Sequence, residues 1–453
     1  MADTNTAQSR HVMAVVGAAT AGSEIARILA ERGSLVVVFE QNLRPYGKIE
    51  DGLPRWHVKQ RKDEYEEINK RLDHPNIEYV PLTRMGRDLQ FDELREAWGL
   101  TGIVLTHGAW RDRPFPVEGA DQFIDRGLVY QNRLIYWFNH YLEAAYNGPS
   151  YALTPGAIVV GGGLASIDVV KVLQIENALA AMAARGIKED MVRLEREGLE
   201  PVLAAHNLKY ADLGLVPCKL YYRRRVLDMP LSDIPPDAPP KRQEALRSAR
   251  VKILDKAMRK YLFEFQELRA PTGLVVENDS LVGVQFARTE VADGRVKILA
   301  GESESAHALL TISSIGSIPE PIPGIPQQGE VYTYADAATG LLIDAPTAVF
   351  AAGNVLTGKG NIKDSLDSGT EIGTRVAEAY LGLSGEQLPI AEGARKEAHA
   401  EGERIANAME ARPRLEPEAV ERLIARVRER QRAVGYKGGY REWIARVTPA
   451  DLQ

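Results

Sequence analysis

Two glycine-rich turns have the residue types and spacing that hold the diphosphate of a dinucleotide. They are Gly17-x-Ala19-x-x-Gly22 and Gly161-x-Gly163-x-x-Ser166. In such a turn the first glycine makes the bend, the middle residue lies near the phosphates, and the third allows close packing of helix and strand. A helix that begins there directs unpaired N–H groups and a positive dipole end toward the phosphates. Two turns in one chain indicate one cofactor that stays bound and another that diffuses.

In each unit, the residues that follow the next strand indicate whether the bound nucleotide has a free ribose or a 2′-phosphate. Glu40 falls 18 residues after Gly22, where a carboxylate can accept both hydroxyls of an adenosine ribose. The second unit has no such acid, because its next strand, 219–222, runs into Arg223, Arg224 and Arg225. Guanidinium groups suit a 2′-phosphate, which favours NADP over NAD, although the arginines could also be a solvated strand end and the choice stays open.

Strand–helix–strand units must position these turns. Residues 12–16 and 35–39 are apolar strands around an amphipathic helix at 23–32, and residues 157–173 repeat the strand, turn and helix. The fold class predicted is α/β, with two Rossmann-like three-layer dinucleotide-binding domains. We expect a discontinuous first domain (1–115 and 335–385), a second domain (116–334) with a helical insertion at 174–217, and a helical C-terminal extension (386–453).

Composition narrows the class of protein further. A formal charge of −6 argues against general nucleic-acid binding, and no apolar run is long enough to span a membrane. The polar N-terminus lacks a signal-peptide pattern, so a cytoplasmic location is expected. Cys218 is the single cysteine, which excludes an intrachain disulfide and a cysteine-ligated iron–sulfur cluster. Redox chemistry would therefore need organic cofactors, with any metal centre on a partner.

Several further segments, in order, carry a resemblance. They are GLPRWHVKQ from Gly52, HGAWRDRPFPVEG from His107, GGGLASIDVVKVL from Gly161, YYRRRVLDMP from Tyr221 and AAGNVLTGKGN from Ala351. Over about residues 12–382 the chain resembles the two-dinucleotide-binding flavoproteins typified by the glutamate synthase small subunit and adrenodoxin (ferredoxin-NADP) reductase. It departs from that pattern at Ala19, where glycine is usual, at His107, where threonine is usual, and at Asn354, where an aspartate binds the ribityl chain.

The resemblance implies a glutathione-reductase-like fold that holds FAD on the first unit and NAD(P) on the second. The FAD site implied consists of Gly17, Ala19, Thr20, Ala21, Gly22, Glu40, Gln41, Gly47, Lys48, Ile49, His57, Gly108, Ala109, Gly353, Asn354, Gly360, Asn361, Ile362 and Ser365. The NAD(P) site implied consists of Gly161, Gly163, Leu164, Ala165, Ser166, Arg223, Arg224, Arg225 and Gly316. A helix beginning near Asn361 is expected to stabilise negative charge on the flavin.

The activity implied is hydride transfer between nicotinamide and flavin, with single electrons exchanged with a ferredoxin or iron–sulfur subunit in a hetero-oligomeric complex. The missing cysteine clusters, the insertion and the tail look like the flavin subunits of ferredoxin-type oxidoreductases, such as tungsten aldehyde or 2-oxoacid oxidoreductases. His57 is the candidate catalytic acid or base. Two alternatives stay open: a flavin oxidase or monooxygenase with its own small substrate, and a non-catalytic assembly subunit with a relic nucleotide fold.

Overall fold

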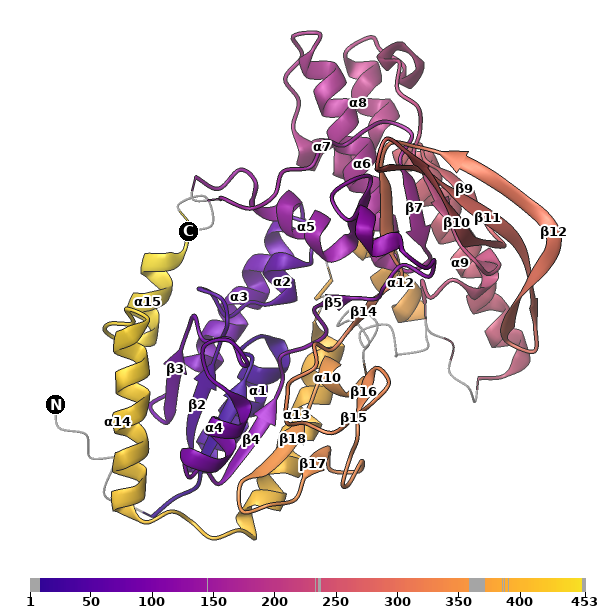
Figure 1. Ribbon diagram of the computed structural model, residues 1–453. Coiled ribbons are helices and arrows are strands. Elements are labelled where there is room, and N and C mark those ends of the chain that lie inside the picture. The colour runs from indigo at the N-terminus through magenta and orange to yellow at the C-terminus, as the bar shows by residue number, and fades with distance from the viewer. Residues whose placement is uncertain are drawn as a thin grey trace.

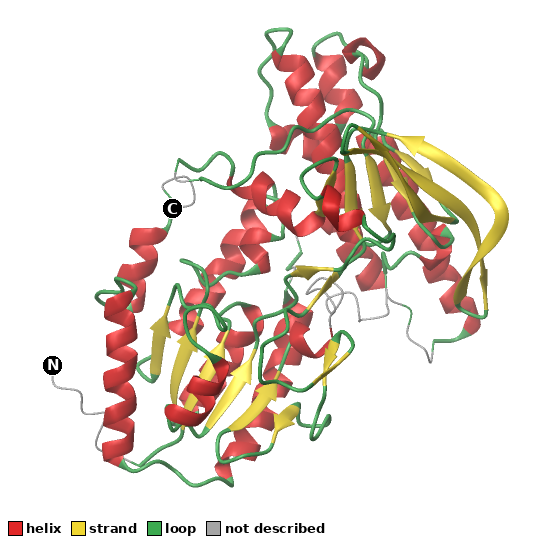
Figure 2. Cartoon of the chain, viewed as in Figure 1, coloured by secondary structure: helices red, strands yellow, loops and turns green. Residues whose placement is uncertain are grey.

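Two halves, each built on a mainly parallel sheet, lie side by side in the computed structural model (Figure 1). The structure describes residues 9–144, 146–232, 234, 238–357, 371–384, 386, 388–389 and 391–449. Helices flank both sheets, as Figure 2 shows. Among the described residues, no helix combines the length and the apolar character needed to cross a bilayer.

The first sheet takes strands from both ends of the chain. Its order is β17 (Leu341–Ile343), β18 (Ala348–Ala351), β4 (Gly102–Leu105), β1 (Val12–Val16), β2 (Leu35–Phe39) and β3 (Ile77–Val80). Every pair is parallel except β17 with β18. All residues of β1 and β2 are buried, which explains their continuous apolar runs, because both faces of a parallel sheet are covered.

Helices from the two ends of the chain cover this sheet. They are α1 (Thr20–Glu31), α2 (Lys48–Asp51), α3 (Val58–Leu72), α4 (Phe91–Ala97), α10 (Asn354–Thr357), α13 (Glu392–Glu410), α14 (Pro417–Ala433) and α15 (Tyr440–Val447). Alternate residues of β1 face opposite layers: Met13 packs in a cluster with Ile405 of α13, and Val12 in a cluster with Val420 of α14. The C-terminal helices are thus part of the core on both faces, and α14 lies beside β3 in Figure 1.

The second sheet is parallel throughout. Its order is β6 (Leu128–Tyr130), β13 (Thr311–Ser314), β7 (Ile158–Gly161), β8 (Lys219–Tyr221) and β9 (Glu264–Gln266). Around it lie α5 (Gln131–His140), α6 (Leu164–Ala183), α7 (Met191–Glu197), α8 (Leu199–Ala205), α9 (Pro240–Tyr261) and α12 (Glu371–Tyr380). Residues 174–217, expected to be a helical insertion, contain the end of α6 together with α7 and α8.

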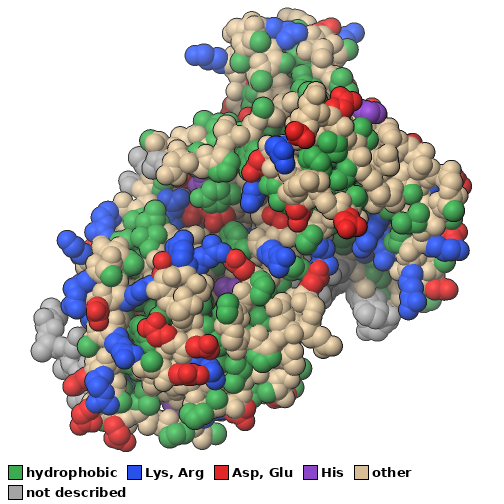
Figure 3. All heavy atoms as spheres, viewed as in Figure 1, with side chains coloured by type: hydrophobic (Ala, Val, Ile, Leu, Met, Phe, Trp, Pro, Cys, Tyr) green, Lys and Arg blue, Asp and Glu red, His purple; other side chains and the backbone are tan. Residues whose placement is uncertain are grey.

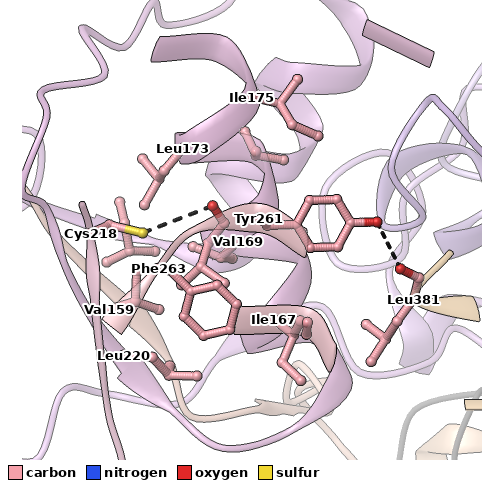
Figure 4. Packing of buried hydrophobic residues seen from close by; sticks show 14 of the residues in the cluster. Val159, Ile167, Val169, Leu173, Ile175, Cys218, Leu220, Tyr261, Phe263 and Leu381 are labelled. Atoms are coloured by element: carbon pink, nitrogen blue, oxygen red, sulfur yellow. Dashed lines mark hydrogen bonds between the residues drawn. The ribbon is translucent and has the colours of Figure 1, made fainter. Parts of the chain in front are cut away.

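The core of this half buries Cys218 among aliphatic and aromatic side chains (Figure 4). Its thiol points to the carbonyl oxygen of Val170 at 3.9 Å, and burial raises the pKa of the thiol. Cys218 is therefore a small core residue and not a reactive thiolate. Among the described residues, no cluster of three or more His, Cys, Asp or Glu side chains could hold a metal ion.

A separate antiparallel sheet covers the second half. A turn at Asn278 and Asp279 joins two strands, β10 (Arg269–Glu277) and β11 (Ser280–Ala292). A third strand, β12 (Arg295–His307), follows, which the sequence analysis did not predict. Phe286 of β11 is stacked on Tyr221 of β8 with ring centroids 4.0 Å apart, so this sheet is fixed to the core.

Two short strands mark the passages between the halves. The chain leaves the first half through β5 (Arg111–Asp112) and returns through β14 (Ser317–Ile318), and these pair antiparallel. A further hairpin, β15 (Gln327–Gln328) with β16 (Val331–Tyr332), follows the return. The domain boundaries expected at 115/116 and 334/335 fall in loops near these passages and stay a prediction.

Candidate nucleotide-binding cavities

The first glycine turn is shaped by close backbone approach. Gly17 has φ of +100°, and a Cβ there would lie 2.7 Å from the carbonyl oxygen of Thr106. A Cβ on Gly22 would lie 1.8 Å from the carbonyl oxygen of Gly17. Ala19 is the residue before α1 and has an ordinary negative φ of −68°. Glycine is required at the two ends of this turn, and alanine is accommodated in the middle.

Glu40 lies at the end of β2 and is almost fully buried. Its Oε2 accepts the N–H of Ala18 at 2.9 Å, and its Oε1 accepts the N–H of Asn42 at 3.0 Å. Burial raises the pKa of this carboxyl to about 7, although the two backbone hydrogen bonds oppose that effect. Each oxygen of the carboxylate retains a further lone pair for a ribose hydroxyl.

The first cavity, of about 330 Å³, opens beyond this turn. The predicted FAD residues that line it are Gly17, Ala19, Thr20, Ala21, Glu40, Gln41, Gly47, Lys48, Gly108, Ala109 and Asn354. The sequence analysis missed 83–87, Trp110 and 320–323, which also line it. The peptide N–H of Thr83 donates to the backbone oxygen of Glu40 at 2.8 Å, which brings 83–87 to the site without any recognisable motif.

Some predicted FAD residues lie elsewhere. Gly22 packs inside the turn, Ile49 lines the second cavity described below, and the N–H of Gly353 donates to Oε2 of Glu401 on α13 at 2.9 Å. Gly360, Asn361, Ile362 and Ser365, with the helix expected near Asn361, lie outside the described residues.

The second glycine turn leaves space where a phosphate would approach. A Cβ on Gly161 would lie 2.2 Å from the carbonyl oxygen of Ser314, and Oγ of Ser166 donates to that same oxygen at 3.0 Å. A Cβ on Gly163, by contrast, would have no neighbour within 4 Å. Gly163 precedes α6, whose first N–H groups face this space.

The second cavity, of about 700 Å³, lies beyond this turn. The predicted NAD(P) residues that line it are Gly161, Gly163, Ala165, Ser166, Arg223, Arg224 and Gly316. Residues that the sequence analysis missed also line it, among them Arg113, Tyr222, Arg269 and Tyr380. Leu164 instead packs in the core of this half.

The structure places Arg225 away from the second cavity. Its Nε lies 2.9 Å from Oδ2 of Asp228, and Arg225 does not line the second cavity. The ion pair forms because Asp228 is three residues away on a single turn of 3₁₀-helix (Val226–Asp228). Of the three consecutive arginines, Arg223 and Arg224 are the two that can reach a ligand there.

The structure places His57, the candidate acid or base, outside the two cavities. The ring is buried and stacked on Tyr380, with centroids 5.0 Å apart and planes at 16°. Burial, with Lys171 and Arg61 nearby, holds the pKa of His57 well below its usual value. His57 lines neither cavity. In this structure His57 packs against Tyr380 in the core, and its catalytic role stays a prediction.

The two cavities meet at three residues. Lys48, Ala109 and Asn354 line both of them. Figure 3 shows Lys and Arg side chains gathered across the band between the two halves on this face. At the second turn, the open space at Gly163 and the helix N-terminus fit a diphosphate. At the first turn, the small residues Ala19 and Ala21 line a cavity in front of the helix N-terminus. Ligands bound beyond the two turns would therefore approach each other at this junction.

The sequence relatives of this chain match it over only part of its length. No protein-family profile matches the chain. It is 29% identical over 181 residues to NADPH-Fe(3+) oxidoreductase subunit beta of Geobacter sulfurreducens, covering 38% of this chain and 24% of that protein. It is 31% identical over 161 residues to the NADPH glutamate synthase small chain of Bacillus subtilis, covering 35% and 31%. The chain thus matches about a quarter to a third of the length of these curated relatives.

Structural similarity to a solved protein extends over nearly the whole chain. The structure of Mycobacterium tuberculosis FprA in complex with NADPH matches with a TM-score of 0.64 at 18% identity, covering 93% of this chain and 91% of FprA. The class is therefore an α/β protein with the fold of FprA, in which each of two mainly parallel sheets leads through a glycine-rich turn into a helix. The predicted resemblance to the glutamate synthase small subunit is confirmed over the 161 residues that match it.

Proposed function

We propose that the protein is an FAD-dependent NAD(P)H oxidoreductase, with FAD on the unit that contains Gly17 and NAD(P)H on the unit that contains Gly163. The observation that carries this proposal is the meeting of the two cavities at Lys48, Ala109 and Asn354. Bound together, the two cofactors supply hydride transfer between nicotinamide C4 and flavin N5, followed by release of single electrons.

The chain contributes positioning and electrostatics to this reaction. The two glycine turns admit phosphates, Glu40 accepts ribose hydroxyls, and Arg224 provides a cation at the second cavity. Hydride transfer needs no side-chain nucleophile or base, so the burial of His57 does not weaken the proposal.

The electron acceptor proposed is a ferredoxin or an iron–sulfur subunit of a hetero-oligomeric complex. One buried cysteine leaves the chain without thiolates for a cluster of its own. The names of the relatives support the idea, since one is an iron(III) oxidoreductase subunit and another a synthase small chain. A cytoplasmic location and a place beside a tungsten aldehyde or 2-oxoacid oxidoreductase are the finer parts of this proposal.

The test begins with purified protein incubated with FAD. We expect a yellow protein whose visible flavin absorption is lost when NADPH is added without oxygen. Gly163→Val should retain FAD but lose reduction by NADPH, because the new side chain fills the open space at the second turn. Gly439→Val is the matched control, since Gly439 also precedes a helix, has φ of −87° against −92° at Gly163, and has open space.

Two results would overturn the proposal. Protein that remains colourless with added FAD would favour the non-catalytic assembly subunit. Oxygen consumption that depends on a small organic substrate and needs no partner would favour the oxidase or monooxygenase.

A further inference from the structure

Lys48 is the charged side chain where the two cavities meet. It is the first residue of α2, it is partly buried, and it lines both cavities. Its ammonium donates to Oγ of Ser317 at 3.2 Å and to Oδ1 of Asn132 at 3.4 Å. Among the described residues its hydrogen-bond partners are these two neutral oxygens, with the Asp112 carboxylate nearby, so its positive charge stays available to a ligand.

The passages between the two halves hold this ammonium in place. Ser317 belongs to β14, and Asn132 donates from Nδ2 to Oγ of Ser317 and to the carbonyl oxygen of Trp110, both at 3.0 Å. The Asn132 N–H in turn donates to Oδ1 of Asp112 on β5 at 3.2 Å. A flexible lysine side chain is thereby restricted to one location, which is a condition for useful preorganised electrostatics.

The ammonium group of Lys48 is poorly solvated. Burial lowers the pKa of Lys48 to about 8, and the nearby Asp112 carboxylate opposes that decrease. The indole ring of Trp110 lies with its centroid 5.6 Å from Nζ. In such surroundings a cation interacts with a second charge far more strongly than in bulk water.

We propose that Lys48 stabilises the reduced, negatively charged form of a flavin bound in the first cavity and thereby raises its reduction potential. The inference rests on the proposed function. A hydride brings two electrons and one proton to a neutral ring, so the ring gains one negative charge. A fixed ammonium beside that ring favours the reduced state, with no proton leaving Lys48.

The test measures the reduction potential of FAD bound to the wild type, Lys48→Met, Lys48→Arg and Lys62→Met. We expect Lys48→Met to lower the ratio of reduced to oxidised flavin at a fixed potential about tenfold, which is about 30 mV for a two-electron couple. Lys48→Arg keeps the charge and should stay near the wild type. Lys62 is an exposed residue of α3, so its replacement should leave the potential unchanged.

Binding of ADP distinguishes loss of charge from loss of structure, because ADP has the nucleotide half of FAD without the ring. Lys48→Met should bind ADP and oxidised FAD as the wild type does, and reduced FAD about tenfold more weakly. Unchanged potentials in an FAD-loaded Lys48→Met protein would overturn the inference and leave the proposed function intact. Failure of the wild type to bind FAD would overturn both.

Discussion

The ammonium of Lys171 on α6 lies 2.9 Å from Oε1 of Glu195 on α7, and the lysine side chain has no exposed surface. The same ammonium donates to the carbonyl oxygen of Leu381 at 3.2 Å, and the hydroxyl of Tyr261 donates to that oxygen at 3.0 Å (Figure 4). One buried charge thus joins the helix of the second nucleotide turn, the expected insertion and the segment after α12. The insertion completes the core and is not a detachable appendage.

Replacing Glu195 with alanine should therefore destabilise the protein. Glu195 is the nearer of two carboxylates that pair with Lys171, the other being Asp168 at 3.7 Å, so its removal leaves this buried charge with weaker compensation. We expect the free energy of unfolding to fall by about 3 kcal/mol. Urea unfolding measures this change. Glu197→Ala, on the exposed side of the same helix, should change little. Equal losses of stability in Glu195→Ala and Glu197→Ala would show that the ion pair with the buried Lys171 does not stabilise the protein.

Gly22→Ala should damage the first nucleotide unit. The new methyl group would meet the carbonyl oxygen of Gly17, so the turn and α1 must separate. We expect a loss of about 3 kcal/mol in stability, typical of severe overpacking, together with loss of FAD retention. Thermal unfolding and flavin content measure the two effects. Gly439→Ala, where the methyl group has space, serves as the control, and similar behaviour of both variants would contradict the turn geometry.

The selectivity between NADPH and NADH should depend on Arg224 and not on Arg225. Arg224 lines the second cavity, whereas Arg225 is occupied by Asp228. Arg224→Ala should raise the KM for NADPH about tenfold, as expected for the loss of one charge-assisted hydrogen bond, with little effect on NADH. Steady-state kinetics with both nucleotides measures this. A loss of NADPH selectivity in Arg225→Ala would contradict the assignment.

His140 of α5, which contacts Asp51 of α2 in the first half, should make the stability of the protein depend on pH. Burial alone would lower the pKa of His140, but hydrogen bonds to Asp51 at 2.9 Å and to Glu143 at 2.7 Å raise it to about 9. Because the folded pKa exceeds the unfolded value near 6.5, the stabilisation is fully present below about pH 6.5 and is lost as the pH rises through 9.

We expect His140→Gln to remove about 2 kcal/mol of this pH-dependent stability. Chemical unfolding at several pH values from neutral to alkaline, compared between wild type and variant, isolates the contribution of this residue. If the free energy of unfolding changed with pH in the same way in both proteins, the contribution assigned to His140 would be contradicted.

The sequence allowed prediction of the features that depend on neighbouring residues. The strands Val12–Val16 and Leu35–Phe39 and the two glycine turns follow from local patterns of apolar residues and glycine, and the structure has them at these places.

Features that depend on distant contacts were not predictable. His57 lies under Tyr380, far along the chain, and no local pattern indicates that stacking. Segment 83–87 reaches the first cavity because it follows β3, which pairs with β2, and not through any motif. Arg225 is different: Asp228, three residues later, was a visible signal that its charge would be neutralised.

The order in which the halves can fold during synthesis follows from the strand order. The sheet of the second half uses strands that lie between Leu128 and Ser314, so its segments leave the ribosome one after another. The sheet of the first half lacks β18 and the helices α13 and α14 until residue 433 has been translated. The amino-terminal segment therefore lacks β18 and two covering helices at a stage when every strand of the later sheet has been translated.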